Sequence, residues 1–177
     1  LATAEAWATQ EGFSHIATRI QLLWFAEIGR TNGEAVDEQL FQTAVDTATR
    51  LNMYEIEVHL AKAACISEHR DTHLQAALKQ MSEPRWASLA FRAWLDLAAV
   101  LHDGSDTPGA EEALAEALKL AKQYNDPSCE IESRSRIALH LIDRGLASTA
   151  QPHLEEAQRL ARVEEDDLST VMLSGLL

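Results

Sequence analysis

The apolar residues of the chain recur at intervals of three and four positions over most of its length, which is the spacing of one face of an α-helix. This pattern occurs twice in nearly the same form, in segments 91–124 and 131–164. Corresponding positions follow one another at a 40-residue spacing: Trp94, Leu97, Ala98, Leu101, Ala110, Leu114 and Ala117 match Arg134, Ile137, Ala138, Leu141, Ala150, Leu154 and Ala157. A turn signal divides each segment, at Gly104 with Pro108 and at Gly145. We therefore predict two helical hairpins in which the alanines let neighbouring helices approach closely, and a fixed period of this length is typical of a solenoid.

Turn residues divide the remainder of the chain into further helical segments. We expect about ten helices, with ranges of 1–11, 13–30, 34–51, 53–69, a shorter helix ending near residue 81, one opening at Pro84, and then 108–124, 127–144, 147–162 and 165–177. Asn52 is predicted to cap the start of the helix over 53–69, and Arg70 to Thr72 are predicted to turn the chain after it. Before residue 84 the register of the repeat stays open, because a 40-residue spacing and a 33-residue spacing each align part of that sequence with the later copies.

The composition favours an all-α fold. The 177 residues include only seven Gly and four Pro, while Ala, Leu, Glu and Gln, which are good helix formers, are abundant. Apolar residues make up 46% of the chain, which is ordinary for a folded domain. No stretch shows the alternation of β-branched residues that marks a strand, so we expect little or no sheet.

The net charge of −13 restricts the choice of partners. An acidic surface repels phosphate backbones and anionic headgroups, so we expect neither direct nucleic-acid binding nor membrane association. The longest apolar run is far shorter than the roughly 18 residues of a membrane span, and we expect that the first residues are not a signal peptide, because they lack a basic stretch followed by an apolar block. We expect Cys65 and Cys129 to be free thiols in the cytoplasm. Because the first residue is Leu, we also expect a segment of a longer protein.

The order of large, apolar and small residues in the two copies resembles the tetratricopeptide repeat. The second copy departs from the pattern at Arg134, which stands in a large apolar position, and Lys122 and Arg162 stand where a Pro often closes the repeat. The resemblance implies a right-handed superhelical solenoid of αα-hairpins over residues 1–177. The 40-residue period and the opening Ala-Glu-Ala-Trp-Ala are similar to the superhelical domain of large bacterial transcription activators of the maltose-regulator and LuxR type.

In that family the first helix of each pair lines the concave surface, which implies a partner-binding face. Basic residues gather on the predicted first helices and acidic residues on the second helices. We therefore take Lys62, Arg92 and Arg136 as candidate partner-binding residues, and Trp86 as the aromatic candidate. The alternative is that the arginines pair with nearby acids, such as Arg134 with Glu130. The Lys and Asn clamp by which some members hold a C-terminal carboxylate is not matched, because its positions hold Leu95, Ala99, Ser135 and Leu139.

The sequence contains no pattern that indicates an enzyme. His69 and His73 have the i, i+4 spacing of metal ligands, but the predicted turn between them favours surface histidines and no metal site. The carboxylates occur in runs such as Glu111-Glu112, which are typical of a solvated face. Glycine-rich phosphate loops and a nucleophile–His–carboxylate order are both missing, so we expect no catalytic residue and no cofactor.

Two functions remain from these observations. The first is a protein-interaction module that binds a peptide or a partner surface on its concave face. The second is a regulatory domain of a multidomain transcription activator, which would sense a small effector or an inhibitory protein.

Overall fold

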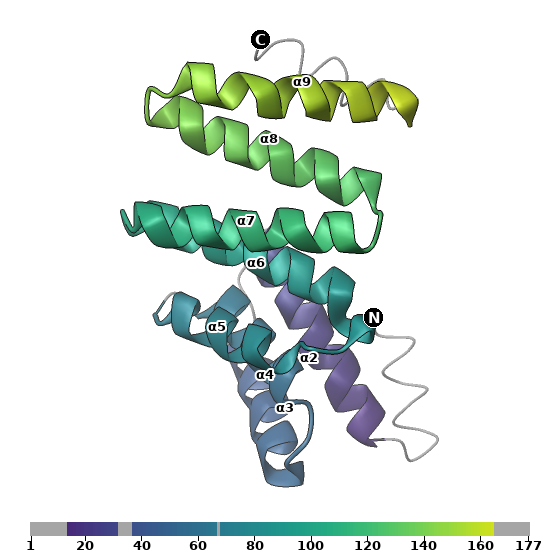
Figure 1. Cartoon of the computed structure of the whole chain (residues 1–177). Helices are drawn as coiled ribbons and strands as arrows, with labels where there is room; N and C mark the ends of the chain where they lie inside the picture. Colours follow the sequence, from purple (N-terminus) through teal and green to yellow (C-terminus); the bar gives the residue numbers. More distant parts are fainter. Residues whose placement is uncertain (1–13, 32–36, 67, 165–177) are drawn as a thin grey trace. The chain divides into compact units, whose positions relative to one another are not determined.

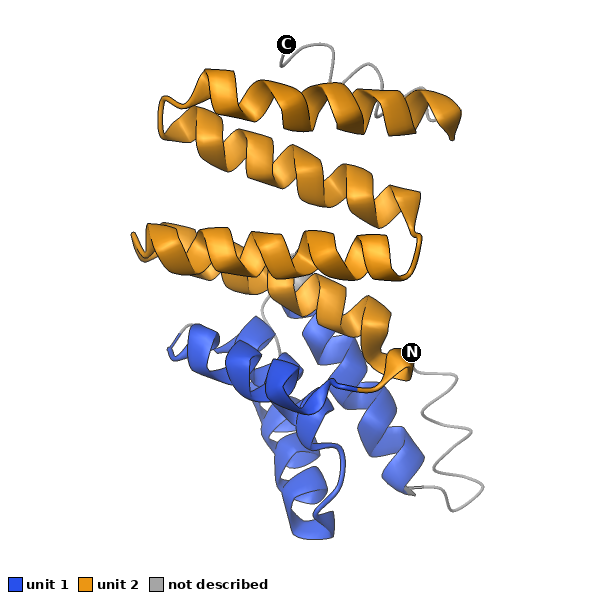
Figure 2. Cartoon of the chain, viewed as in Figure 1, with its two compact units in different colours: residues 1–82 blue, residues 83–177 orange. Residues whose placement is uncertain are grey.

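The computed structural model describes residues 14–31, 37–66 and 68–164, and every regular element in these ranges is a helix (Figure 1). The described residues contain no strand, so the prediction of an all-α fold is confirmed. The chain divides into two compact units, residues 1–82 and 83–177, which are coloured separately in Figure 2. The helices predicted at 1–11 and 165–177 lie outside the described residues.

Unit 2 is built from helices of equal length. A short 3₁₀ helix, η1 (Pro84–Trp86), leads into α6 (Ala87–Asp103), α7 (Thr107–Gln123), α8 (Pro127–Asp143) and α9 (Ala147–Val163), each of 17 residues. The first residues of α8 and α9 follow those of α6 and α7 at the same 40-residue spacing as the sequence pattern. Successive helices are antiparallel and pack against one another, α6 on α7, α7 on α8 and α8 on α9 (Figure 1).

Three identical turns set the spacing in unit 2. In each turn one residue adopts a left-handed conformation: Ser105 at φ 64°, Asn125 at φ 50° and Gly145 at φ 74°. The N–H of the next residue closes each turn, because it donates to the carbonyl five residues earlier. These hydrogen bonds run from Asp106 to Leu101 at 2.8 Å, from Asp126 to Ala121 at 3.0 Å and from Leu146 to Leu141 at 2.9 Å. This is the Schellman arrangement that ends many helices. One helix together with the short turn that follows it accounts for half of the 40-residue period.

Alanines allow the helices of unit 2 to approach closely. The four small positions matched in the sequence are all buried: Ala98, Ala117, Ala138 and Ala157. Larger apolar residues surround them, and those of the last hairpin form one cluster that includes Ile131, Leu141 and Leu154. The side-chain carboxylates of Asp106 and Asp126 cap α7 and α8, since they accept backbone N–H groups at 3.1 and 3.0 Å.

Unit 1 contains α2 (Ser14–Thr31), α3 (Glu38–Leu51), α4 (Glu55–Cys65) and α5 (Arg70–Gln80). The helix α2 packs against α3 and α4, and α4 packs against α5. The core between them includes Phe25 and Phe41, whose rings meet edge to face with centroids 5.4 Å apart, and Trp24 packs against this core. Gly29 permits the close approach of α2 and α4, because a Cβ at this position would lie 2.6 Å from the Ala64 carbonyl oxygen.

An ion pair between an exposed Arg19 and a buried Glu57 joins α2 to α4. The Nε of Arg19 donates to Oε1 of Glu57 at 2.7 Å, and the Glu57 side chain is only 3% exposed. Glu57 occupies a position that is apolar in both copies of the repeat if the 40-residue spacing is extended. Arg19 allows a carboxylate to be buried there because it supplies the opposite charge and a hydrogen bond.

Two predictions about the turns of unit 1 are wrong. Asn52 ends α3 and does not open α4: it adopts a left-handed conformation at φ 51°, and Met53 N–H closes the turn on the Ala48 carbonyl at 3.1 Å. Asn is favoured both at helix starts and in left-handed C-terminal turns, so its identity did not distinguish the two. Arg70 to Thr72 form the first turn of α5 and not a break, and the chain turns before them.

The helices of unit 1 do not repeat the lengths of those in unit 2. The helices α4 and α5 have 11 residues each, whereas α6 and α7 have 17 each, so no constant shift superimposes the two pairs. Helix α3 begins at Glu38, with Asp37 as its cap, rather than at residue 34.

Candidate functional site

The candidate partner-binding residues lie in both units. Lys62 is half-buried on α4 of unit 1, while Trp86, Arg92 and Arg136 belong to unit 2. Trp86 is half-buried in η1, and the guanidinium of Arg85 lies 5.3 Å from the centre of its ring, which is a cation–π distance. Arg92 on α6 and Arg136 on α8 are both exposed.

Arg136 lies at the edge of a pocket between α6 and α8, which we call the α6–α8 pocket. It has a volume of about 180 Å³, and α7 contributes Leu114 to its lining. The other residues that matter here are Leu95, Ala99 and His102 from α6, and Arg136, Leu139 and Asp143 from α8. Leu139 is among the most exposed large apolar residues of the described chain. The pocket therefore combines an apolar surface with one positive and one negative side chain.

The guanidinium of Arg136 is held by its own helix. It donates two hydrogen bonds to Oε1 of Glu132, one turn earlier, at 3.3 and 3.1 Å. Both side chains are about half exposed, so the pair is worth only a few tenths of a kcal/mol. A partner carboxylate can therefore displace Glu132 at little cost.

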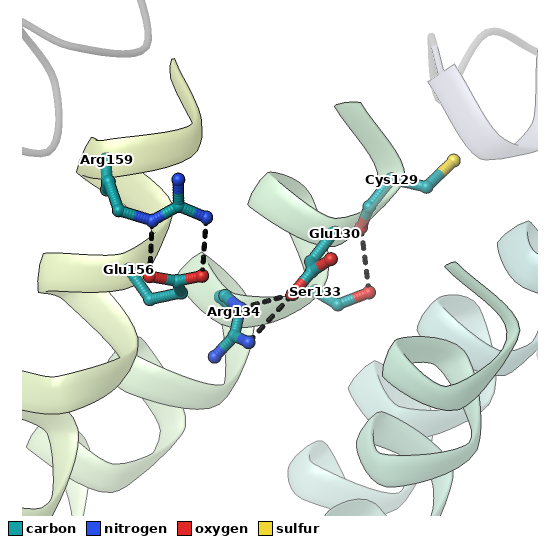
Figure 3. A network of polar contacts seen from close by, with 6 residues as sticks. All are labelled: Cys129, Glu130, Ser133, Arg134, Glu156 and Arg159. Atoms are coloured by element: carbon teal, nitrogen blue, oxygen red, sulfur yellow. Dashed lines mark hydrogen bonds and ion pairs between the residues drawn. The ribbon is translucent and has the colours of Figure 1, made fainter. Parts of the chain in front are cut away.

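Arg134, the residue that departs from the repeat, is engaged in a polar network between α8 and α9 (Figure 3). Its guanidinium donates to Glu130 at 2.8 Å, as the alternative interpretation of the arginines predicted, and the side chain is only 14% exposed. On α9, Glu156 pairs with Arg159 at 2.8 Å, and this hydrogen bond lowers the pKa of Glu156. The charge of Arg134 lowers this pKa further, so the two ion pairs of Figure 3 interact.

Two pairs of histidines come into contact, and the sequence interpretation missed both. The Nδ1 atoms of His59 on α4 and His73 on α5 lie 3.1 Å apart in unit 1. In unit 2 the Nδ1 atoms of His102 on α6 and His140 on α8 lie 3.2 Å apart. In each pair one imidazole donates and the other accepts, so both rings can stay neutral. The 40-residue spacing brings His102 and His140 within two positions of each other in the repeat, which was an available signal for the second pair.

Neither cysteine has the properties of a nucleophile. Cys65 and Cys129 are free thiols. Burial raises the pKa of Cys129 to about 11, and the hydrogen bond with Asp126 and the charge of that carboxylate contribute to the shift. Burial also raises the pKa of Cys65, whose thiol donates to the Phe25 carbonyl at 3.4 Å. Since the thiolate is the reactive form, the raised pKa values disfavour nucleophilic reaction at both cysteines.

Within the described ranges, no three or more His, Cys, Asp or Glu side chains lie close enough together to hold a metal ion. His69 precedes α5 as its cap residue, and His73 faces His59. No helix in the described part of the chain is both long enough and apolar enough to cross a membrane.

Comparison with known proteins gives no relative. No protein-family model, no curated protein and no solved structure matches the chain. The function of the protein is therefore inferred from the arrangement of its own residues.

Proposed function

We propose that unit 2 is a protein-interaction module that binds a peptide, or an extended segment of a partner protein, on the face formed by α6 and α8. The observation that carries this proposal is the α6–α8 pocket, where apolar side chains lie next to Arg136 and Asp143. Specific peptide recognition needs both features, because an apolar anchor supplies affinity and flanking charges set orientation.

The repeated hairpins support a solenoid of the tetratricopeptide type. The helices α6 and α8 are the first helices of two hairpins with identical lengths and identical turns. In such a fold the first helices share one face, which is the face that carries the α6–α8 pocket. We extend this architecture to the whole chain as a right-handed solenoid of about ten helices, and we place the protein in the cytoplasm.

The pocket suggests the composition of the peptide. Leu95, Ala99 and Leu139 offer an apolar contact for one aliphatic or aromatic side chain. Arg92 and Arg136 lie on the same helices and are exposed, so an acidic residue next to the apolar anchor is favoured. A carboxylate in the peptide would compete with Glu132 for Arg136.

A peptide array of apolar side chains flanked by Asp or Glu would test this function with the full chain. Replacing Arg92 and Arg136 together by Ala should weaken binding by about tenfold or more, since each charged contact contributes up to about 1 kcal/mol. A matched control replaces two exposed basic residues outside the proposed face, Lys79 and Arg162. Equal binding by the two double variants would contradict the proposal.

A second candidate function is a regulatory domain that senses a small effector. It is supported by a second cavity between α7, α8 and α9, which is lined in part by His140 and His153. A full-length sequence with an NTPase domain before this segment and a helix-turn-helix domain after it would favour this function.

A further inference from the structure

Unit 2 contains a second cavity, which lies between α7, α8 and α9 and which we call the α7–α9 cavity. Its volume is about 570 Å³, which is within the range of small-molecule sites. Most of the lining is apolar and includes Leu114, Leu118 and Ile137. The polar lining includes Lys122, His140 and His153. A largely apolar pocket with a few convergent polar groups is the usual form of a ligand site.

His140 forms part of the wall between this cavity and the α6–α8 pocket, since it lines both. Its Nδ1 faces His102, which lines only the α6–α8 pocket. Its Nε2 lies 4.0 Å from Oε1 of Glu111, which lines only the α7–α9 cavity. This distance is too long for a hydrogen bond, and Nε2 is a buried atom without a hydrogen-bond partner among the described residues. The His140 side chain is 6% exposed, so water of the bulk solvent does not satisfy it.

The protonation of His140 follows from its surroundings. Burial lowers the pKa of His140, and the neighbouring His102 lowers it further, so the ring is neutral at pH 7. If Nδ1 of His102 donates to Nδ1 of His140, the proton of His140 is on Nε2, which faces the carboxylate that Glu111 shares with Arg144. In this tautomer His140 offers an N–H donor on the side of the α7–α9 cavity.

His153 repeats this situation on α9. Its Nδ1 is also buried and has no hydrogen-bond partner in the described part of the chain. Burial lowers the pKa of His153, and the positive charges of Arg134 and Lys122 lower it further. Of these two charges, that of Lys122 belongs to the cavity lining, and it makes this end of the cavity favourable for a negative group. Both nitrogens belong to side chains that line the α7–α9 cavity, and a hydrogen-bond partner for either of them would reduce the cost of burying it.

The lysines add a positive charge at the mouth of the cavity. Lys119 is held by Glu116, whose two oxygens accept at 3.0 and 2.9 Å. Lys122 is exposed, and its ammonium forms no ion pair with any of the residues in 14–31, 37–66 or 68–164. The charge of Lys122 is therefore the one that a ligand can use.

We propose that the α7–α9 cavity binds a small organic carboxylate with an apolar body. The carboxylate lies at the end marked by Lys122 and His153, and the apolar body lies against Leu114, Leu118 and Ile137. The imidazole N–H groups and the Lys122 ammonium supply donors for the oxygens of the ligand. The inference rests on the second candidate function, because it names the chemical class of the effector for the same cavity. It does not depend on peptide binding, although Leu114 and His140 line both the α7–α9 cavity and the α6–α8 pocket.

Titration of the full chain with sodium octanoate, used as the probe, tests the proposal. Calorimetry should show saturable binding of one octanoate per chain. Octanamide, which has the same length without the charge, should bind at least about tenfold more weakly. Long-range ¹H–¹⁵N spectra of the histidines should show shifts at Nε2 of His140 and Nδ1 of His153, while His59 in unit 1 stays unchanged. Equal binding of octanoate and octanamide, or saturation without these shifts, would overturn the assignment.

Three variants locate the site. Lys122→Gln should weaken octanoate binding about tenfold, whereas Lys79→Gln, which removes an exposed lysine of unit 1, should leave it unchanged. Ala115→Phe places a ring at an exposed lining position and should abolish the histidine shifts. The replaced residues are exposed, so circular dichroism and thermal melting should report intact folds. Binding that is the same in all three variants would place octanoate elsewhere and refute the proposal.

Discussion

Replacing Arg19 by Ala is expected to destabilise unit 1 strongly, because the substitution removes the guanidinium that pairs with a buried carboxylate. The Nε of Arg19 lies 2.7 Å from Oε1 of Glu57, and the Glu57 side chain is only 3% exposed. The same guanidinium lies 5.7 Å from the centre of the Tyr54 ring. The variant thus loses an ion pair between α2 and α4 and a cation–π contact next to it.

The size of the effect follows from burial. Deleting one partner of a fully buried ion pair costs about 3–5 kcal/mol, because the remaining charge is left without compensation. Arg19 is 44% exposed, so water can enter and solvate part of the remaining charge, which reduces the expected cost to about 2–3 kcal/mol. That loss is large beside a total stability of about 5–15 kcal/mol.

Urea unfolding followed by circular dichroism measures the loss, and hydrogen exchange in α2 and α4 localises it to unit 1. The matched double variant Arg19→Met with Glu57→Leu replaces both charges by apolar groups. Such replacements are often neutral, so the double variant should lie within about 1 kcal/mol of the natural protein. If Arg19→Ala costs less than about 0.5 kcal/mol, or if the double variant is as unstable as the single one, the carboxylate does not depend on its partner in the way described.

Three other predictions concern backbone geometry and pH. Gly29→Ala should lower the stability of unit 1 by about 1–2 kcal/mol in urea unfolding, because its Cβ would lie 2.6 Å from the Ala64 carbonyl oxygen. Gly104→Ala is the control and should cost less, because the nearest contact of its Cβ would be at 3.3 Å. Ser105 and Gly145 both have positive φ, which glycine adopts more easily than other residues. Ser105→Gly should therefore stabilise unit 2, and Gly145→Ala should destabilise it by about 1 kcal/mol. A lower melting temperature for Ser105→Gly, or a higher one for Gly145→Ala, would contradict this. Burial lowers the pKa of His140 below its unfolded value of about 6.5, so its contribution to stability is complete above pH 6.5 and is lost as the pH falls. The melting temperature should therefore fall less between pH 7.5 and pH 5.5 for His140→Gln than for the natural protein.

The features of unit 2 that the sequence predicts well depend on local signals. Gly145, Pro108 and Pro127 mark the turns, and the alanines that recur at the 40-residue spacing mark the interfaces between helices. Each of these signals acts within one helix or one turn, where the preference of a residue for a backbone conformation is strong. The same kind of signal failed at Asn52, because Asn suits both ends of a helix and only packing decides between them.

The site residues show where sequence patterns become insufficient. Arg136 was selected from its place on a first helix, but its neighbours in the α6–α8 pocket come from three helices. The contact between His102 and His140 joins residues 38 positions apart, and no local preference specifies it. Glu57 and Arg19 illustrate the same limit, since a buried carboxylate is stable only when a distant chain segment supplies its partner. Long-range packing of this kind follows from the assembled helices and not from their separate periodicities.

The three identical turns of unit 2 restrict how this part of the chain can change in length. Each helix presents its alanines to its neighbour on one side, and adding a single residue inside a helix would rotate every later side chain by about 100° around the axis. Duplication of two successive helices with their turns, such as residues 107–146, would instead restore every interface, because the copy begins and ends in the same Schellman geometry. Genetic or engineered lengthening of this unit should therefore be tolerated in whole two-helix steps and rejected for smaller insertions within helices.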